Sequence, residues 1–402
     1  MNILFLTQVL PYPLDAGPKV RAYYTLRHLA ERHRVTLLSF VRDSDRAESI
    51  EALKAICDRV ETVPMRRSRL REGWALARSA ATGEPFLIAR DSVPEMYRAV
   101  RGLMAQQRYE AVHADQLWMA PYALAARVEA RRHGDSPRLV LDQHNAVHLI
   151  PQRMALSAGN GLARAGLKRE AARMAAYEAQ CCAQFDRVVA VTAEDRDALL
   201  GLYRNGSRPA SFPVIPICIE ADAAVAPRRA GEAGILFLGG MHWPPNADGV
   251  RWFAREVLPE VGRRASGATF FAVGRDAPTD LPAGLPIVAP GYVADAQSYW
   301  DRSRVFVVPL RAGGGMRVKI LDAWSRGVPV VSTTLGAEGI VCRPGEDILI
   351  ADTPQAFAEA VAAVLSDAAL HERLSRGGLR TVRAKYDWRT VYSAWDEIYE
   401  ST

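Results

Sequence analysis

Short apolar runs alternate with longer amphipathic stretches along most of this 402-residue chain. Strands that are apolar on both faces and separated by helices are typical of a parallel sheet covered by helices. The first series of predicted strands comprises residues 3–7, 35–40, 111–113, 139–142 and 187–191, and the second comprises 235–238, 269–273, 287–288, 305–309 and 328–332. The pattern therefore predicts an α/β protein built from doubly wound parallel sheets.

A stretch rich in proline and alanine, residues 213–234, separates the two series of strands. A chain of this length has material for two or three domains. We therefore predict two Rossmann-like domains, residues 1–220 and 221–385, which face each other across a cleft that binds the ligand at the carboxyl ends of the strands. Aromatic and apolar residues recur at helical spacing in residues 386–402. This last helix could pack against either domain and is assigned to the first.

The composition excludes several classes of protein. Apolar residues make up 49% and charged residues 24% of the chain, as in ordinary globular domains. The five cysteines are odd in number and have no zinc-binding spacing, so we expect a reduced cytoplasmic environment and no structural metal. No apolar run approaches the roughly 20 residues that span a bilayer. The net charge of +6 is not accompanied by a nucleic-acid-binding module, so nucleic acid is not expected as a partner.

The stretch from residue 305 to residue 339 carries the clearest chemical signal. A predicted strand ends at Pro309, three glycines at 313–315 turn the chain, and a helix is predicted over residues 316–326. Glycines at the start of a helix allow backbone N–H groups to converge on an anion, and the helix dipole adds positive potential there. The stretch therefore predicts a phosphate-binding loop; a glycine turn beside a solvated basic helix face is the structural alternative.

Charged residues on this predicted helix support the same interpretation. Arg317 and Lys319 lie in its first turn, where positive charge opposes the helix dipole and a bound anion would compensate for it. Asp322 lies three residues after Lys319 on the same face. It is placed either to accept hydrogen bonds from a ribose or to pair with Lys319.

These segments, taken in order, resemble the retaining glycosyltransferases of family four, which have the GT-B fold, over nearly the whole chain. The segments that carry the resemblance are residues 4–21, Asp142-Gln-His-Asn145, 189–195 and 214–220 in the first half, and 235–246, 271–275, 290–293 and 305–339 in the second. The combined pattern is most similar to the sugar transferases associated with PEP-CTERM and exosortase-type exopolysaccharide loci.

The resemblance implies transfer of a hexose, with retention and without a metal or other cofactor, from a nucleoside diphosphate sugar to a glycan or lipid-linked acceptor in polysaccharide synthesis. It implies that His144 is an active-site histidine and that Lys319 and Arg317 stabilise the leaving diphosphate. The residues implied in donor binding are Gly17, Gly239, Gly240, Arg275, Tyr292, Val293, Arg311, Gly313, Gly314, Gly315 and Asp322.

The sequence departs from the family pattern at two places. Most members carry two glutamates, separated by seven residues, around the second glycine loop, and here these positions are Gly314 and Asp322. Gly314 cannot accept hydrogen bonds from sugar hydroxyls as a carboxylate would. The basic pair expected after the first glycine loop is missing from residues 241–246, and we expect Arg311, with Arg317 and Lys319, to supply that charge.

Three other functions remain to be weighed. A non-hydrolysing sugar-nucleotide epimerase shares the fold, and a non-catalytic nucleotide-sugar-binding protein would tolerate Gly314. An NAD-dependent oxidoreductase is disfavoured, because residues 7–17 lack the G-x-G-x-x-G pattern of the first βα turn.

A basic segment precedes Trp74 and contains four arginines: Arg66, Arg67, Arg69 and Arg71. Cations mixed with apolar anchors can lie on an anionic membrane surface and bring a lipid-linked acceptor to the enzyme. A solvated helix face rich in arginine is the equal alternative. We therefore expect a cytoplasmic protein, with a peripheral position on the inner face of the cell membrane as a hypothesis.

Other polar residues are weaker candidates. His113 and His148 are expected to be structural histidines, and Glu178 is expected at the surface. The vicinal Cys181 and Cys182 lie in a helical stretch and are expected to pack against the core.

Overall fold

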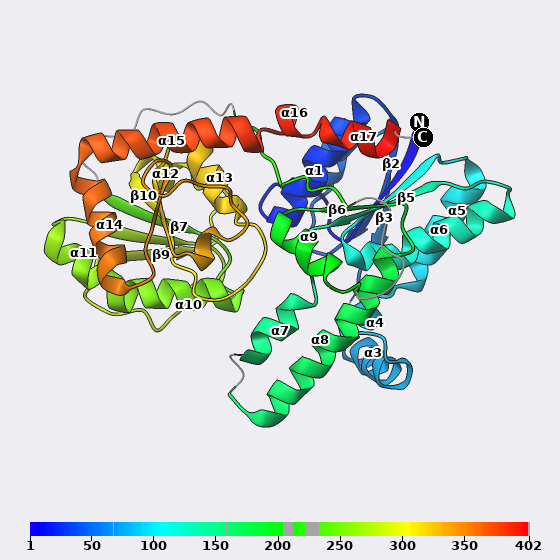
Figure 1. The fold of residues 1–402 in the computed structure, drawn as a ribbon, viewed down its shortest axis with the longest axis horizontal. Helices are drawn as coiled ribbons and strands as arrows, with labels where there is room; N and C mark the ends of the chain where they lie inside the picture. The colour runs from blue at the N-terminus through cyan, green and yellow to red at the C-terminus, as the bar shows by residue number, and fades with distance from the viewer. Residues whose placement is uncertain (67, 157–158, 204–211, 222–232, 401–402) are drawn as a thin grey trace. The chain divides into compact units, whose positions relative to one another are not determined.

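The computed structural model describes residues 1–66, 68–156, 159–203, 212–221 and 233–400. The chain forms two compact units (Figure 1). Unit 1 comprises Met1–Cys218 together with Val391–Thr402, and unit 2 comprises Ile219–Thr390. The division after Cys218 falls close to the boundary predicted at residue 220, and the last twelve residues return to unit 1.

Unit 1 contains a six-stranded parallel sheet in the order β3-β2-β1-β4-β5-β6. Its strands are β1 (Asn2–Thr7), β2 (Arg34–Val41), β3 (Arg59–Pro64), β4 (Ala111–Asp115), β5 (Arg138–Gln143) and β6 (Arg187–Ala190). Its helices are α1 (Gly17–Ala30), α2 (Ala47–Lys54), α3 (Arg69–Thr82), α4 (Phe86–Arg90), α5 (Pro94–Gln106), η1 (Leu117–Met119), α6 (Ala120–Arg132), α7 (Leu149–Leu156), α8 (Gly161–Cys182), α9 (Ala193–Leu200) and α17 (Ala394–Glu400).

Unit 2 repeats this architecture with a six-stranded parallel sheet in the order β12-β11-β10-β7-β8-β9. Its strands are β7 (Gly234–Leu238), β8 (Thr269–Val273), β9 (Ile287–Gly291), β10 (Ser303–Val308), β11 (Val330–Ser332) and β12 (Ile348–Ile350). Its helices are α10 (Pro244–Trp252), η2 (Phe253–Val257), α11 (Leu258–Arg264), α12 (Gln297–Asp301), α13 (Val318–Ser325), η3 (Leu335–Ala337), α14 (Pro354–Ser366) and α15 (Ala368–Tyr386); α16 (Trp388–Val391) lies where the chain leaves this unit.

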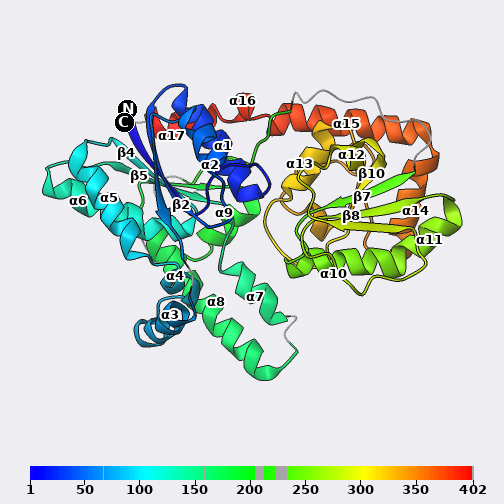
Figure 2. The ribbon, with the colours of Figure 1, turned by 180° about the vertical axis from the view of Figure 1, so that it is seen from behind.

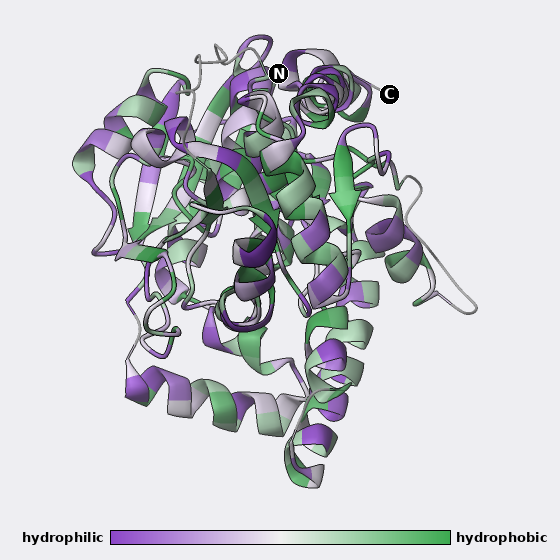
Figure 3. Ribbon diagram, turned by 90° about the vertical axis from the view of Figure 1, so that its left-hand side faces the viewer, coloured by the Kyte–Doolittle hydropathy of each residue, from purple (hydrophilic) through white to green (hydrophobic). Residues whose placement is uncertain are grey.

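The central strands of both sheets are buried, with helices packed on both sheet faces (Figures 1 and 2). All residues of β1 from Ile3 to Leu6 are fully buried, as are Ile235–Phe237 of β7. Figure 3 shows hydrophobic colour on the strands, whereas the helices carry hydrophobic and hydrophilic colour in alternation. Burial of both sheet faces explains why the strands read as continuous apolar runs rather than as alternating patterns. The predicted α/β fold with two doubly wound parallel sheets is confirmed.

Two strands escaped the sequence prediction. β3 has the sequence RVETVP and lies at the edge of its sheet, where polar residues are tolerated. β12 is an edge strand of three residues, too short for a period to be recognised. The predicted helix over residues 316–326 is also shorter than expected: α13 begins at Val318, and Arg317 occupies its N-cap position.

None of the helices in the described part of the chain is both long enough and apolar enough to cross a membrane.

Candidate active site

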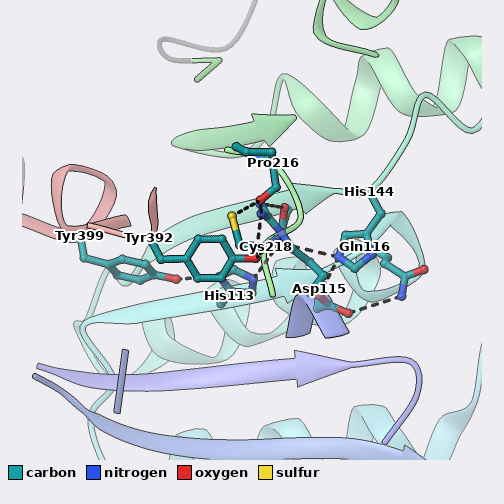
Figure 4. Close-up of polar contacts among 10 residues, drawn as sticks. His113, Asp115, Gln116, His144, Pro216, Cys218, Tyr392 and Tyr399 are labelled. Atoms are coloured by element: carbon teal, nitrogen blue, oxygen red, sulfur yellow. Dashed lines mark hydrogen bonds and ion pairs between the residues drawn. The ribbon is translucent and has the colours of Figure 1, made fainter. Parts of the chain in front are cut away.

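A group of buried polar residues lies at the carboxyl ends of β4 and β5 in unit 1. The two strands are neighbours, and their register places Asp115 directly beside Asp142. His144 follows β5 by one residue, and its Nε2 lies 2.8 Å from Asp115 Oδ1 and 3.7 Å from Asp142 Oδ2 (Figure 4). The side chains of both aspartates are inaccessible to solvent, and that of His144 is only 7% exposed. The sheet itself therefore assembles a histidine between two carboxylates.

The carboxylates determine the charge of His144. Burial alone would lower the pKa of His144, but Asp115 and then Asp142 outweigh it and raise this pKa to about 9. At neutral pH the ring is therefore an imidazolium, whose Nε2–H donates to Asp115. Burial works against ionisation of Asp142 as well, but Arg21, followed by His144, holds the pKa of that carboxyl below its usual range. Burial raises the pKa of Asp115, against the opposing effect of His144. The site thus pairs Arg21 with Asp142 and His144 with Asp115 inside the protein.

Arg21 holds Asp142 in place from α1. Its Nε and Nη2 donate to the two carboxylate oxygens at 2.9 and 3.0 Å, a bidentate geometry in which the guanidinium is fully buried. Nη1 donates to the carbonyl oxygen of Pro216 at 2.6 Å and to the hydroxyl of Tyr392 at 3.3 Å. The guanidinium also lies over the rings of Tyr392 and Trp395, 5.4 and 5.0 Å from their centroids. The returning C-terminal segment thus completes the surroundings of this arginine.

His113 precedes Asp115 by two residues on β4, so both side chains lie on the same face of the sheet. His113 is a structural residue. Its ring stacks on Phe5 with the centroids 4.1 Å apart, and its Nδ1 shares a 2.6 Å hydrogen bond with the hydroxyl of Tyr399. Burial, which outweighs the nearby charge of Asp142, lowers the pKa of His113 to about 3. The ring is therefore neutral, as a fully enclosed histidine should be.

His113, Asp115 and Asp142 also form the one group of potential metal ligands found among the described residues, with ligand atoms within 4.8 Å of one another. Both oxygens of Asp142 accept from Arg21, and Asp115 accepts from His144. Two protein cations thus already compensate the charge of these carboxylates, and the donor set fits this ionic network better than a metal ion.

A buried glutamate shapes the loop that carries His144. Glu178 of α8 is fully buried, and its carboxylate accepts from the backbone N–H groups of Val147 and His148, both at 2.8 Å, and from His148 Nδ1 at 2.6 Å. Asp195 holds the same loop by accepting from Ala146 N at 2.8 Å. The expectation that Glu178 lies at the surface was wrong. The spacing of apolar residues along a helix predicts which side chains face the core. It cannot indicate that amides of a distant loop require the carboxylate of Glu178 as their acceptor.

Unit 2 brings its two glycine loops together around Lys319. The Nζ of Lys319 lies so close to the first loop that a Cβ at Gly239 would come within 2.7 Å of it. Nζ donates to Asn246 Oδ1 at 3.2 Å and lies 4.3 Å from the ring centroid of Phe237. Asn246 is itself fixed, because its Nδ2 donates to the carbonyl of Gly240 at 2.8 Å.

Lys319 is a cation without a counter-ion. It makes no ion pair with any of the residues that the structure describes. Burial, and then the proximity of Arg317, lower the pKa of Lys319 to about 7. An ammonium in such surroundings is poorly stabilised, so the site favours an anionic ligand.

Arg317 folds back over the triple glycine. It is buried, and its Nη1 donates to the carbonyl oxygen of Gly314 at 2.5 Å. Gly313 and Gly315 have φ values of 111° and 81°, in the left-handed region where a side chain would be strained. The glycines are therefore required for the turn that places Arg317 and Lys319 at the start of α13.

The remaining predicted donor residues of unit 2 have partners of their own. Arg311 is exposed and pairs with Asp248 at 2.8 and 3.1 Å, so part of its charge is already compensated, and its role as a substitute for the missing basic pair stays a prediction. Asp322 pairs with Arg326 at 3.0 Å rather than with Lys319. Arg275 lies over the ring of Tyr292, 4.5 Å from its centroid.

Gly17 and Val293 are the last two of the residues predicted to bind the donor. Gly17 is the first residue of α1, after the loop that follows β1, and Val293 follows Tyr292 beyond the end of β9. Three polar residues that the sequence interpretation did not select also hold these sites: Arg21, Asp115 and Asn246. Arg21 and Asn246 belong to segments that carry the family resemblance, residues 4–21 and 235–246. A linear motif does not indicate which side chains form pairs in the folded chain.

Two family models match the chain. The model described as glycosyl transferase 4-like domain matches residues 16–217, half of the chain. The model described as glycosyl transferases group 1 matches residues 232–367. Each model therefore falls within one of the two structural units.

Known proteins match over parts or all of the chain. The phosphatidyl-myo-inositol mannosyltransferase of Mycobacterium leprae is 33% identical over 201 residues, 46% of this chain and 53% of that protein. A Klebsiella pneumoniae protein described as "uncharacterized 44.6 kDa protein in cps region" is 24% identical over 175 residues, 40% of this chain and 45% of that protein. The chain thus spans about half the length of the curated relatives it matches.

The crystal structure of Anabaena Alr3699/HepE in complex with UDP and glucose matches with a TM-score of 0.70 at 14% identity, over 100% of both chains. At that identity the likeness shows the shared GT-B fold.

Proposed function

The chain belongs to the glycosyl transferase 4-like and group 1 families, and from this premise we propose that it transfers a hexose, with retention, from a nucleoside diphosphate sugar to a glycan or lipid-linked acceptor. The observation that carries the proposal is Lys319, a partly buried cation that makes no ion pair with any described residue, lies against one glycine loop and follows the other. A diphosphate supplies the negative charge that this arrangement lacks. The relatives support the donor class, since one is named a mannosyltransferase and another was solved with UDP and glucose.

We propose that Lys319 and Arg317 act chiefly on the leaving group. When the glycosidic bond of the donor breaks, negative charge grows on the diphosphate oxygens. Fixed cations at the start of α13 stabilise that growing charge without reorganising, which lowers the activation barrier. In a retaining transfer the donor phosphate then accepts the proton of the attacking hydroxyl, and no metal or other cofactor takes part in this proposal.

His144 is proposed to contact the donor sugar. As an imidazolium it can donate hydrogen bonds to a hydroxyl, and the carboxylate that most family members use for sugar contacts is replaced by Gly314. Asp322 keeps acceptor capacity beyond its bond to Arg326 and is proposed to accept from a ribose hydroxyl.

The reaction is proposed to take place in the cytoplasm, at the inner face of the cell membrane. The resemblance to transferases of PEP-CTERM and exosortase-type loci supports a role in exopolysaccharide assembly in the cytoplasm. Contact with an anionic membrane is proposed through Arg66 and Arg69, which are exposed, and the partly exposed Arg71. Arg67 belongs to the same predicted patch but lies outside the described residues.

The proposed activity is tested with a panel of UDP-, GDP- and ADP-sugars. Calorimetry on the full chain should show binding of one nucleoside diphosphate, and chromatography should show transfer to an acceptor extract with the anomeric configuration retained. Lys319→Ala should weaken both, whereas Lys385→Ala, which removes an exposed lysine of α15, should change neither. Binding of a sugar nucleotide followed only by its epimerisation, or by no reaction, would favour the epimerase or the non-catalytic binding protein.

A further inference from the structure

Helix α3 of unit 1 exposes an unusual amount of apolar surface. Of its fourteen residues only Ala75 and Ser79 are buried. Leu70 and Trp74 are one turn apart on the same face of the helix, and their exposed fractions are 81% and 77%; Leu76 is 61% exposed but lies on another side of the helix. A short helix that leaves a tryptophan and a leucine of one face in water has no folding reason to carry them, which indicates that this face binds something.

Three arginines at the start of α3 lack acidic partners among the described residues, whereas Arg78, in the last turns of the helix, pairs with Glu84 at 2.9 Å. Arg66, Arg69 and Arg71 make no ion pair with any described residue. Exposed arginines elsewhere in the same unit are usually paired, as Arg98 is with Glu95 and Arg132 with Glu129. The apolar face of α3 is therefore bordered by positive charge that the protein does not neutralise.

The helix pair α7–α8 shows the same combination. Leu156, the last residue of α7, and Leu162, the second residue of α8, are 80% and 89% exposed. On α8 the cations Lys168 and Arg169 are exposed, and neither makes an ion pair within the described chain. Figures 1 and 3 show α3 and the α7–α8 pair extending from the same end of unit 1. A hydrogen bond from Phe86 N to Glu170 Oε1, 2.8 Å long, ties the segment after α3 to α8.

These observations point to one kind of partner. We propose that α3 and the α7–α8 pair form a docking surface, made of Leu70, Trp74, Leu156 and Leu162 with the unpaired cations beside them, for an anionic lipid bilayer. The leucines and the tryptophan enter the interface between headgroups and acyl chains, and the cations contact lipid phosphates. A bilayer fits better than a protein partner, because the exposed apolar side chains are spread over three helices, α3, α7 and α8, and exposed cations accompany them.

The docking surface is physically connected to the site in unit 1. The loop that carries His144 runs directly into α7, and Glu178, which holds the backbone of that loop, belongs to α8. A bilayer bound to the α7–α8 pair therefore lies next to the loop of His144. This step rests on the proposed glycosyl transfer, and it specifies the acceptor as a membrane-resident, lipid-linked glycan rather than a soluble one.

Vesicle flotation of the full chain tests the docking surface. The protein should float with phosphatidylglycerol and phosphatidylcholine vesicles at low salt, but not with pure phosphatidylcholine vesicles, and should be released as ionic strength rises. Replacing Arg69 and Arg71 with serine should lower the partition coefficient about fivefold per arginine. The apolar pairs Leu70→Ser with Trp74→Ser, and Leu156→Ser with Leu162→Ser, should each lower it on the order of tenfold.

Matched controls separate docking from general surface effects. Trp243→Ser removes a tryptophan of unit 2 that is 45% exposed, and Arg98→Ser removes a paired arginine of unit 1; neither should change flotation. All variants should retain the melting temperature of the wild type, since the replaced side chains are exposed.

Three results would overturn or redirect the inference. A wild-type chain that stays off anionic vesicles at low salt contradicts it, as does equal flotation of the apolar variants and controls. Self-association abolished by the same substitutions would assign the surface to a second copy instead. Nucleotide binding measured on the same preparation distinguishes the two proposals: binding without flotation contradicts only the docking surface, and flotation without nucleotide binding contradicts only the proposed transfer.

Discussion

At the scale of single residues, the site around His144 in unit 1 and the site around Lys319 in unit 2 differ in how their charges are compensated. In unit 1, His144 and Arg21 are paired with carboxylates, so the charges are balanced before any ligand arrives. In unit 2, Lys319 and Arg317 lie near each other, and among the described residues Lys319 has only the neutral Asn246 as a hydrogen-bond partner. The first arrangement favours a fixed geometry, and the second favours a charged ligand.

Lys319→Ala should reduce kcat more than it weakens donor binding. The charge that Lys319 opposes grows during bond cleavage, so its removal should lower kcat by about 10²- to 10³-fold. Steady-state kinetics at saturating donor measure this, with the Lys385→Ala variant as control. Asp322→Ala should show the reverse pattern, a higher KM for donor with a smaller change in kcat, because a ribose hydroxyl is unaltered by the reaction. Equal small losses of stability in both variants with unchanged kinetics would make the two residues structural.

Binding of a diphosphate should be accompanied by proton uptake above neutral pH. The pKa of Lys319 in the free protein is about 7, so at pH 8 most of the amine is neutral, and an adjacent diphosphate raises this pKa. Calorimetry in buffers of different ionisation enthalpy reports the uptake. Lys319→Arg should keep binding and abolish the proton uptake at pH 8, since arginine remains charged throughout. Uptake that persists in Lys319→Arg would assign the proton to another group.

The Asp115–His144 pair should make stability depend on alkaline pH. The pKa of His144 rises from 6.5 unfolded to about 9 folded, so its contribution is complete below about pH 6.5 and is lost as pH rises toward 9. Asp115→Asn removes the largest attractive charge on His144. The free energy of unfolding of this variant should therefore differ from the wild type by on the order of 2 kcal/mol near pH 6, and by less near pH 9. Urea unfolding across this range checks it, and a difference independent of pH would contradict the ion pair.

At the scale of elements, the sequence predicted the buried strands and the glycine loops, and it missed the edge strands and the side-chain pairs between distant residues. Buried strands such as β1 and β7 are continuous apolar runs, which a linear pattern reveals. The short polar edge strands β3 and β12 carry no such signal. The glycine loops and His144 were identifiable from local motifs. Arg21 was not, because the residues that define its role, Asp142 and Tyr392, lie 121 and 371 positions away.

The hydroxyl of Tyr392 should contribute more to the free energy of unfolding than the hydroxyl of an exposed tyrosine. It accepts from Cys218 N at 3.2 Å and from Arg21 Nη1 at 3.3 Å, and both donors are buried. Tyr392→Phe leaves these donors without that acceptor and should lower the free energy of unfolding by about 1–3 kcal/mol. Tyr292→Phe, at a residue 54% exposed, keeps its ring over Arg275 and should cost little. Denaturant unfolding of the two variants, if equal, would contradict the role given to the buried hydroxyl.

At the scale of the whole molecule, the proposed function predicts which segments of each unit a donor protects. A nucleoside diphosphate without sugar should slow hydrogen exchange in unit 2, at residues 239–246 and 313–319, where the glycine loops surround Lys319. The complete sugar nucleotide should in addition protect residues 143–148 of unit 1, because His144 is proposed to contact the sugar. Hydrogen-exchange mass spectrometry with the two ligands resolves this. Identical protection by both ligands would remove His144 from the donor site.

The return of residues 391–400 to unit 1 also sets the order in which the protein can be completed during synthesis. The guanidinium of Arg21 and the ring of His113 emerge early from the ribosome, but Tyr392, Trp395 and Tyr399, which enclose them, are made after all of unit 2. The half of the chain that is translated first therefore reaches its final packing last. Until then it exposes part of its own interior, and the nascent chain depends on unit 2 folding promptly enough to deliver the closing helix.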